Sequence, residues 1–173
     1  MDEGELDGLA PGRDLVLVHV RFRRGEALLH VLAAGGDQPF ALDEEVIGCV
    51  SSANIACGFH AGDPDTMAET MALAAARGVA IGAHPGYEDK QGFGRRVLAM
   101  SPAAVTRMVA YQIGAARSMA ALAGTALTHV KAHGALSNIA SADRAMADAV
   151  AAAVKAVDPS LTLLAIATTA LED

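Results

Sequence analysis

The chain has 173 residues, of which 53% are hydrophobic and 3% aromatic, and its formal net charge is −7. This length favours one domain with an aliphatic core, and the negative charge disfavours nucleic acid as a partner, because phosphates are bound by clustered basic residues. No apolar stretch has the length of a membrane span, the acidic N-terminus lacks a secretory signal, and two cysteines make no disulfide framework. We therefore expect a cytoplasmic protein without a membrane partner, in which Cys49 and Cys57 are packed thiols.

The first 40 residues do not follow the pattern of the rest of the chain. Apolar runs at 15–18 and 27–34 predict two strands, with a turn at 21–26 between them. The predicted organisation is therefore an atypical N-terminal segment over residues 1–40 and a regular α/β domain over residues 41–173.

Helices and strands alternate from residue 41 onward, with boundaries marked by capping residues, prolines and glycines. The pattern predicts helices at 42–50, 63–76, 101–123 and 143–157, strands at 53–58, 79–83, 127–131 and 161–167, and a glycine-rich loop at 85–100. Strands without polar alternation, separated by helices, are typical of a parallel sheet, either in a (β/α) barrel or in a doubly wound fold. Since a complete barrel takes about 200 to 250 residues, the predicted fold class is α/β, in the form of a partial (β/α) barrel.

Three of the predicted strands are each followed by a histidine: His60, His84 and His133. Sites of parallel α/β folds lie at the carboxyl ends of the strands, so these side chains are expected to face one crevice. A single histidine in such a place is more often a hydrogen-bonded structural residue, but three in register favour a functional site. His129, which precedes His133 on the same strand, is expected to be a wall residue deeper in the barrel.

Other polar residues gather at the same edge. Lys131 shares a strand face with His133 and can hold an anionic substrate or stabilise an oxyanion, unless it is paired with a buried carboxylate. Asp63 is expected to cap the next helix, at least as part of its role. Asn54 either binds a substrate amide or fixes its strand.

The loop over residues 91–96 contains two glycines and two arginines, namely Gly92, Gly94, Arg95 and Arg96. Backbone N–H groups and guanidinium groups of this kind can clamp a carboxylate or a phosphate. The alternative interpretation is a flexible surface loop, since neither a Walker A nor a Rossmann glycine pattern is present.

Three histidines and Asp63 suit two kinds of chemistry. Neutral imidazoles with a carboxylate can hold a divalent metal that activates water, and His60, His84 and His133 are the candidate ligands. Alternatively, histidine acts as general base and acid on an amide, with Lys131 and backbone N–H groups stabilising the oxyanion. The residue types leave both alternatives open.

Four motifs carry a resemblance to a known family: SANIACGFHAGDP (52–64), GVAIGAHPGYEDKQGFGRR (78–96), YQIGA (111–115) and HVKAHGALSN (129–138). Over about residues 42–167 the chain closely resembles the LamB/YcsF family, the A subunit of bacterial 5-oxoprolinase. The resemblance implies a barrel related to glycoside hydrolase and sugar deacetylase barrels. It also implies ATP-dependent opening of 5-oxo-L-proline to L-glutamate, performed together with partner subunits B and C.

The strand-end positions, the glycine-rich loop and the resemblance together give a set of candidate site residues. The catalytic candidates are His60, His84, His133, Lys131 and Asp63, and the substrate-binding candidates are Asn54, Gly92, Gly94, Arg95, Arg96 and Asn138.

The chain departs from the family pattern at three places. The acidic first strand, DLNxDxGE in the family, is replaced after residues 14–18, and the motif KPHGALYN has Ala132 and Ser137 instead of proline and tyrosine. The last strands of the family are absent after Ala167.

These departures predict a member incomplete at both ends. They keep two alternatives open: a non-catalytic remnant that still binds the partner subunits, and a stand-alone metal-dependent amide hydrolase or deacetylase. An exposed sheet edge would also favour a homo-oligomer.

Overall fold

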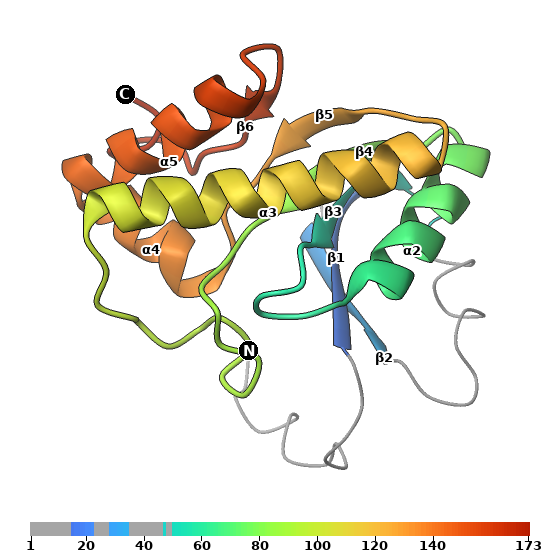
Figure 1. Ribbon diagram of the computed structural model, residues 1–173, viewed down its shortest axis with the longest axis horizontal. Coiled ribbons are helices and arrows are strands. Elements are labelled where there is room, and N and C mark those ends of the chain that lie inside the picture. The colour runs from blue at the N-terminus through green and yellow to red at the C-terminus, as the bar shows by residue number, and fades with distance from the viewer. Residues whose placement is uncertain (1–14, 23–27, 35–46, 48–49) are drawn as a thin grey trace.

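The computed structural model describes residues 15–22, 28–34, 47 and 50–173 (Figure 1). The strands are β1 (Leu15–Phe22), β2 (Leu28–Ala34), β3 (Val50–Ala56), β4 (Ala80–His84), β5 (Leu127–Val130) and β6 (Thr162–Leu163). The helices are α2 (Pro64–Ala76), α3 (Pro102–Leu122), α4 (Gly134–Ala142) and α5 (Arg144–Val157).

The strands form one sheet in the order β2-β1-β3-β4-β5-β6. Strands β3, β4, β5 and β6 are parallel neighbours, and β1 runs antiparallel to both β2 and β3. The predicted α/β fold class with parallel strands is therefore confirmed. Both strands expected in the N-terminal segment are present and belong to the same sheet as the rest. The proposed division of the chain after residue 40 stays a prediction.

Helix starts follow the capping chemistry that the sequence predicts. The Thr66 N–H donates to the carboxylate of Asp63 at 2.8 Å, and the Ala104 N–H donates to the hydroxyl of Ser101 at 3.3 Å. In both helices a proline follows the cap, where its missing N–H costs nothing. The bounds of α2 and α3 therefore lie close to the predicted ones.

Several predicted elements differ from the structure. Residues 134–142 form α4, which was not predicted, and the predicted strand at 161–167 is limited to Thr162–Leu163. Strand β1 continues to Phe22, so the predicted turn began too early, and its remainder lies outside the described residues. The helix predicted at 42–50 also lies largely outside them, although Ile47 is helical and Val50 already belongs to β3.

The helices cover one face of the sheet (Figure 1), where α3 crosses the parallel strands between α2 and α5. The core between these layers is aliphatic and almost fully buried; it includes Ile55, Ile81 and Val130 from the strands and Met71 and Ile113 from the helices. No helix within the described residues is long and apolar enough to cross a membrane.

Cys57 belongs to this core, as predicted. It is 4% exposed, and its burial raises the pKa of the thiol to about 12. Cys49 lies outside the described residues.

Candidate functional site

The three strand-end histidines meet in the structure, and we call His60, His84 and His133 the histidine cluster. Their exposed fractions are 1%, 0% and 3%, so all three are buried. His84 is the last residue of β4, while His60 and His133 follow β3 and β5. Because these strands are parallel neighbours, their carboxyl ends bring the three rings to one edge of the sheet.

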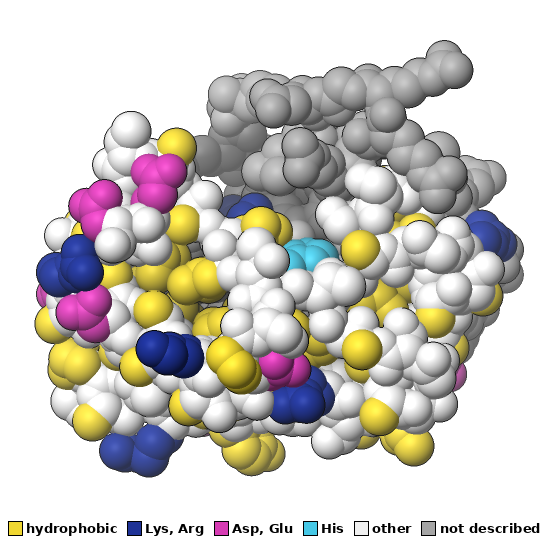
Figure 2. Space-filling view, turned by 90° about the horizontal axis from the view of Figure 1, so that it is seen from above, with side chains coloured by type: hydrophobic (Ala, Val, Ile, Leu, Met, Phe, Trp, Pro, Cys, Tyr) yellow, Lys and Arg dark blue, Asp and Glu magenta, His cyan; other side chains and the backbone are white. Residues whose placement is uncertain are grey.

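The rings of the cluster are in direct contact. The rings of His60 and His133 are stacked, with centroids 3.9 Å apart and an interplanar angle of 9°. The ring of His84 stands edge-on to both, with its centroid 4.9 Å from that of His133 and 5.7 Å from that of His60. Figure 2 shows one face of the molecule, on which basic, acidic and hydrophobic side chains are interspersed.

Hydrogen bonds to the main chain orient two of these rings. Nδ1 of His84 lies 2.5 Å from the carbonyl oxygen of Lys131, and Nε2 of His133 lies 2.7 Å from that of Phe93. Carbonyl oxygens only accept hydrogen bonds, so each of these ring nitrogens carries a proton.

The positions of these two protons decide what the contact between His84 and His133, the histidine pair, can be. Nδ1 of His133 and Nε2 of His84 are 3.1 Å apart. We call these two facing atoms the inner nitrogens, and the two that donate to carbonyls the outer nitrogens. If both rings are neutral, both inner nitrogens carry lone pairs, so one additional proton is needed to form a hydrogen bond between them. With the added proton, the two imidazoles can share it; without it, their two lone pairs are directed toward each other.

Glycines allow the cluster to pack this closely. A Cβ on Gly86 would lie 2.7 Å from Nδ1 of His60, and one on Gly94 would lie 2.8 Å from the Cβ of the same histidine. Gly94 also has a φ of +66°, which side chains rarely adopt. The predicted role of Gly94 in substrate binding remains a prediction, while the structure shows it packed against the cluster.

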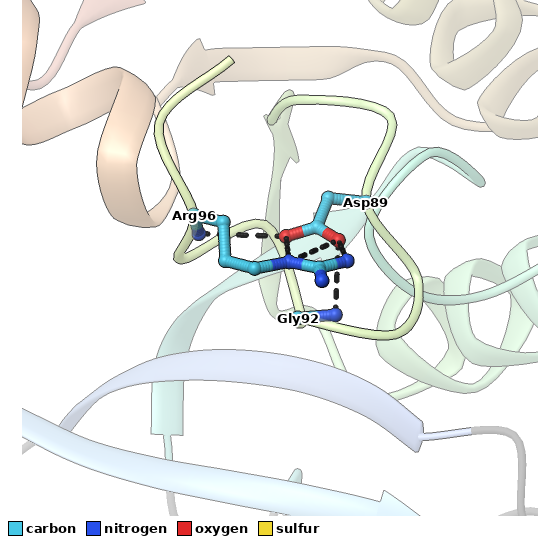
Figure 3. Close-up of polar contacts among 3 residues, drawn as sticks. All are labelled: Asp89, Gly92 and Arg96. Atoms are coloured by element: carbon cyan, nitrogen blue, oxygen red, sulfur yellow. Dashed lines mark hydrogen bonds and ion pairs between the residues drawn. The ribbon is translucent and has the colours of Figure 1, made fainter.

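The loop over residues 89–96 is held together by its own ion pair (Figure 3). The carboxylate of Asp89 accepts from Nε of Arg96 at 3.0 and 3.1 Å and from the Gly92 N–H at 3.0 Å, and Nη2 of Arg96 also contacts it. The hydrogen bonds from Arg96 lower the pKa of Asp89 to about 2. Arg96 and Gly92 thus bind Asp89, whereas the sequence suggested a clamp for substrate. Their contact with substrate remains a prediction.

The folded loop brings Phe93 to the cluster, a residue that the sequence analysis missed. Phe93 has a φ of +54°, uncommon for a residue other than glycine, and its carbonyl accepts the hydrogen bond from His133. Its ring stands edge-on to those of His60 and His133, with centroids 5.8 and 5.3 Å away. Arg95 lies beside this ring, with its guanidinium carbon 5.7 Å from the centroid. An aromatic residue between Gly92 and Gly94 was the available signal.

Gln112 of α3 is a second residue that the sequence analysis missed. It is fully buried, and its amide donates to the Gly86 carbonyl at 2.8 Å and accepts from the Gly86 N–H at 3.0 Å. These two hydrogen bonds hold the backbone of Gly86, which follows His84 by two residues and packs against His60. The signal was a single amide within the apolar run of the helix, in the motif YQIGA.

The remaining predicted residues occupy different places. Asp63 caps α2, as predicted, and Asn138 is exposed on α4. Asn54 is 5% exposed and stands opposite Gly82 in the register of β3 and β4. Lys131 is half-buried, which lowers the pKa of its ammonium group. The roles predicted for these residues toward a substrate remain predictions.

The fit of a metal ion to these residues is limited. Within the described ranges, no group of three or more His, Cys, Asp or Glu side chains is arranged to hold one. The stacking of His60 on His133 agrees with this, because stacked rings do not point their nitrogens at a common centre.

Fold and site together define an α/β protein with three buried imidazoles at the carboxyl edge of parallel strands, the edge where parallel α/β folds build their sites. Residues 34–173 match the sequence profile of the LamB/YcsF family, and the chain belongs to this family.

Curated relatives and a solved structure agree with this assignment. The A subunit of 5-oxoprolinase from Azorhizobium caulinodans is 58% identical over 123 residues, which cover 71% of this chain and 49% of that protein. The corresponding 5-oxoprolinase protein from Gluconobacter oxydans is 52% identical over 130 residues, which cover 75% and 51%. A lactam utilization protein from Thermus thermophilus matches with a TM-score of 0.75 at 50% identity, covering 79% of this chain and 56% of that one. The chain spans about half the length of the curated relatives it matches.

Proposed function

We propose that the chain supplies the histidine cluster of the A subunit in a 5-oxoprolinase, which opens 5-oxo-L-proline to L-glutamate with ATP and partner subunits B and C. The observation that carries this proposal is the His84–His133 pair, whose outer nitrogens are held by main-chain carbonyls and whose inner nitrogens are 3.1 Å apart. The names of the curated relatives support the substrate and a complex of several subunits.

The chemistry of lactam opening matches what the pair can do. Hydrolysis of a cyclic amide needs a base to activate water and an acid to protonate the leaving nitrogen. Two imidazoles that share a proton can perform both tasks in turn, and the ammonium group of Lys131 complements the substrate carboxylate or the oxyanion. The free energy of ATP is used by the complex as a whole.

The test is reconstitution. Purified chain is mixed with subunits B and C, ATP and 5-oxoproline, and the release of glutamate is measured. We expect release from the unaltered chain and from Lys155→Ala, an exposed change on α5, but not from His84→Phe. Partner binding without any glutamate from a folded chain would contradict the proposal and indicate the non-catalytic alternative.

A stand-alone metal-dependent amide hydrolase is the second candidate. It is favoured by the outer nitrogens of His84 and His133, because metal-binding histidines usually donate their other ring N–H to a carbonyl or carboxylate. Metal analysis of protein purified without a histidine tag tests it. Stoichiometric metal, together with amide hydrolysis that a chelator abolishes in the absence of partners and ATP, would favour this candidate over the first.

A further inference from the structure

His129 of β5 is a buried histidine outside the cluster. It is 6% exposed, and the strand register places it opposite Gly82 of β4. A Cβ added to Gly82 would lie 2.2 Å from Nε2 of His129, so the imidazole covers this glycine. The absence of a side chain at residue 82 is what gives the ring its place.

The hydrogen bonds of the neighbouring threonine assign the tautomer of His129. The hydroxyl of Thr128 donates its single proton to the Ile81 carbonyl at 3.2 Å, and its oxygen lies 2.7 Å from Nδ1 of His129. Since a carbonyl cannot donate, both contacts are hydrogen bonds at the same time only when the hydroxyl oxygen accepts from Nδ1–H. Burial lowers the pKa of His129, which favours the neutral ring. Nε2 then carries a lone pair and acts as an acceptor.

This acceptor has no hydrogen-bond partner among the described residues. Buried polar atoms in folded proteins are nearly always hydrogen-bonded, to protein, water or a ligand. The missing partner must be a donor, because Nε2 in this tautomer can only accept. A carbonyl or carboxylate group does not meet that requirement, whereas an N–H or O–H group does.

His129 lies on the same side of the sheet as the site already described. The chain stays paired with its neighbour beyond β5, since the Lys131 N–H donates to the Ala83 carbonyl at 3.0 Å and the His133 N–H to the Pro85 carbonyl at 2.9 Å. Alternate residues of an extended chain point to the same side, so His129 shares a face with Lys131 and His133. Gly82 and His84 share the matching face of β4. The Nε2 acceptor therefore lies on the same side of the sheet as the histidine cluster, further from the carboxyl edge.

We propose that Nε2 of His129 accepts a hydrogen bond from the N–H of a secondary lactam, which makes His129 a specificity-determining residue for cyclic amides. This inference rests on the proposed function. At neutral pH the ring N–H is the one donor of 5-oxoproline, since its carbonyl and carboxylate oxygens only accept. The assignment gives the substrate an orientation, with its N–H toward β5 and Gly82.

The test is a double-mutant cycle between protein and ligand. Binding of 5-oxoproline is compared with binding of the cyclopentanone carboxylate that has CH₂ in place of the ring N–H, by calorimetry on the reconstituted complex without ATP. We expect the unaltered chain to prefer the lactam by about fivefold to tenfold, the value of one hydrogen bond. His129→Phe should bind both ligands equally, and His129→Gln, which keeps an acceptor, should retain a preference. Thermal unfolding checks that each variant is folded.

The outcomes separate the two proposals. If the unaltered complex turns over 5-oxoproline but His129→Phe keeps the full preference for the lactam, the His129 assignment is wrong and the proposed function stands. If the unaltered complex neither binds nor turns over 5-oxoproline, both are wrong. Nitrogen NMR of the histidine rings adds a measurement that needs no ligand: His129 protonated on Nε2 instead of Nδ1 would overturn the assignment.

Discussion

Nδ1 of His133 lies 3.1 Å from Nε2 of His84, although the two residues are 49 positions apart in the chain. Each ring is anchored on its outer side by a main-chain carbonyl, so the inner contact is set by the backbone. A proton held between the two rings belongs to the pair and to neither residue alone.

The two histidines should therefore behave as one functional unit. We expect His84→Phe and His133→Phe each to reduce glutamate release by at least about 100-fold, the range of general acid–base catalysis. The double variant should lose hardly more than either single one, because the first change already destroys the pair. Turnover of the reconstituted complex measures this, and additive losses would show that the rings act independently.

Gln112 should stabilise the chain after His84. Gln112→Leu keeps an apolar volume in α3 but leaves the buried N–H and carbonyl of Gly86 without their partner. We expect the free energy of unfolding to fall by about 2–3 kcal/mol in denaturant titrations. Arg107→Ala, an exposed change on the same helix, is the control and should be nearly neutral. Equal stability of the two variants would contradict the stabilising role of Gln112.

Two contributions to the cost of replacing Gly94 can be measured separately: its close packing against the cluster and its positive φ. Gly94 and Gly78 have similar φ values of +66° and +65°, but a Cβ meets the cluster only at Gly94 and finds nothing within 4 Å at Gly78. Gly78→Ala should cost about 1 kcal/mol of unfolding free energy, the strain of a positive φ. Gly94→Ala should cost about 3 kcal/mol and also impair turnover, because the loop must move away from His60 and His133. Similar losses in both variants would mean that the contact is unimportant.

Asp89 should make stability depend on acid pH. Its pKa is lowered from an ordinary 3.8 to about 2, mainly by the hydrogen bonds from Arg96, so the folded state favours the ionised form. The stabilisation is fully present above the unfolded value and is lost as pH falls from about 4 towards 2. Asp89→Asn should be less stable at neutral pH and should flatten this part of the profile of midpoint temperature against pH. An unchanged profile would show that the ion pair contributes nothing to folding.

The sequence predicts the convergence of the histidines well, because that convergence follows from topology. Asp63 and Ser101 mark helix starts locally, and alternation of helices with apolar strands implies parallel pairing. Once the strands are parallel, residues that follow their carboxyl ends must meet. His60, His84 and His133 could therefore be placed together without knowledge of any contact between them.

Other features depend on contacts that no local pattern contains. Arg96 was expected to reach a ligand, but a carboxylate seven residues earlier binds it. Gln112 and Phe93 act through hydrogen bonds with residues 26 and 40 positions away. Helix α4 is short and contains Gly134, Ser137 and Asn138, which are poor helix formers, so its sequence does not predict it.

The anchoring of His84 and His133 by main-chain carbonyls has a consequence for which positions of this site can be substituted. The carbonyl groups of Lys131 and Phe93 accept these hydrogen bonds, so a substitution at either residue changes the surroundings of the rings but keeps the two acceptors. Gly86 and Gly94 have no such freedom, since any added atom meets an imidazole. The site therefore admits a change of side chain at its two anchoring positions, whereas a side chain at either glycine requires the loop or the rings to shift.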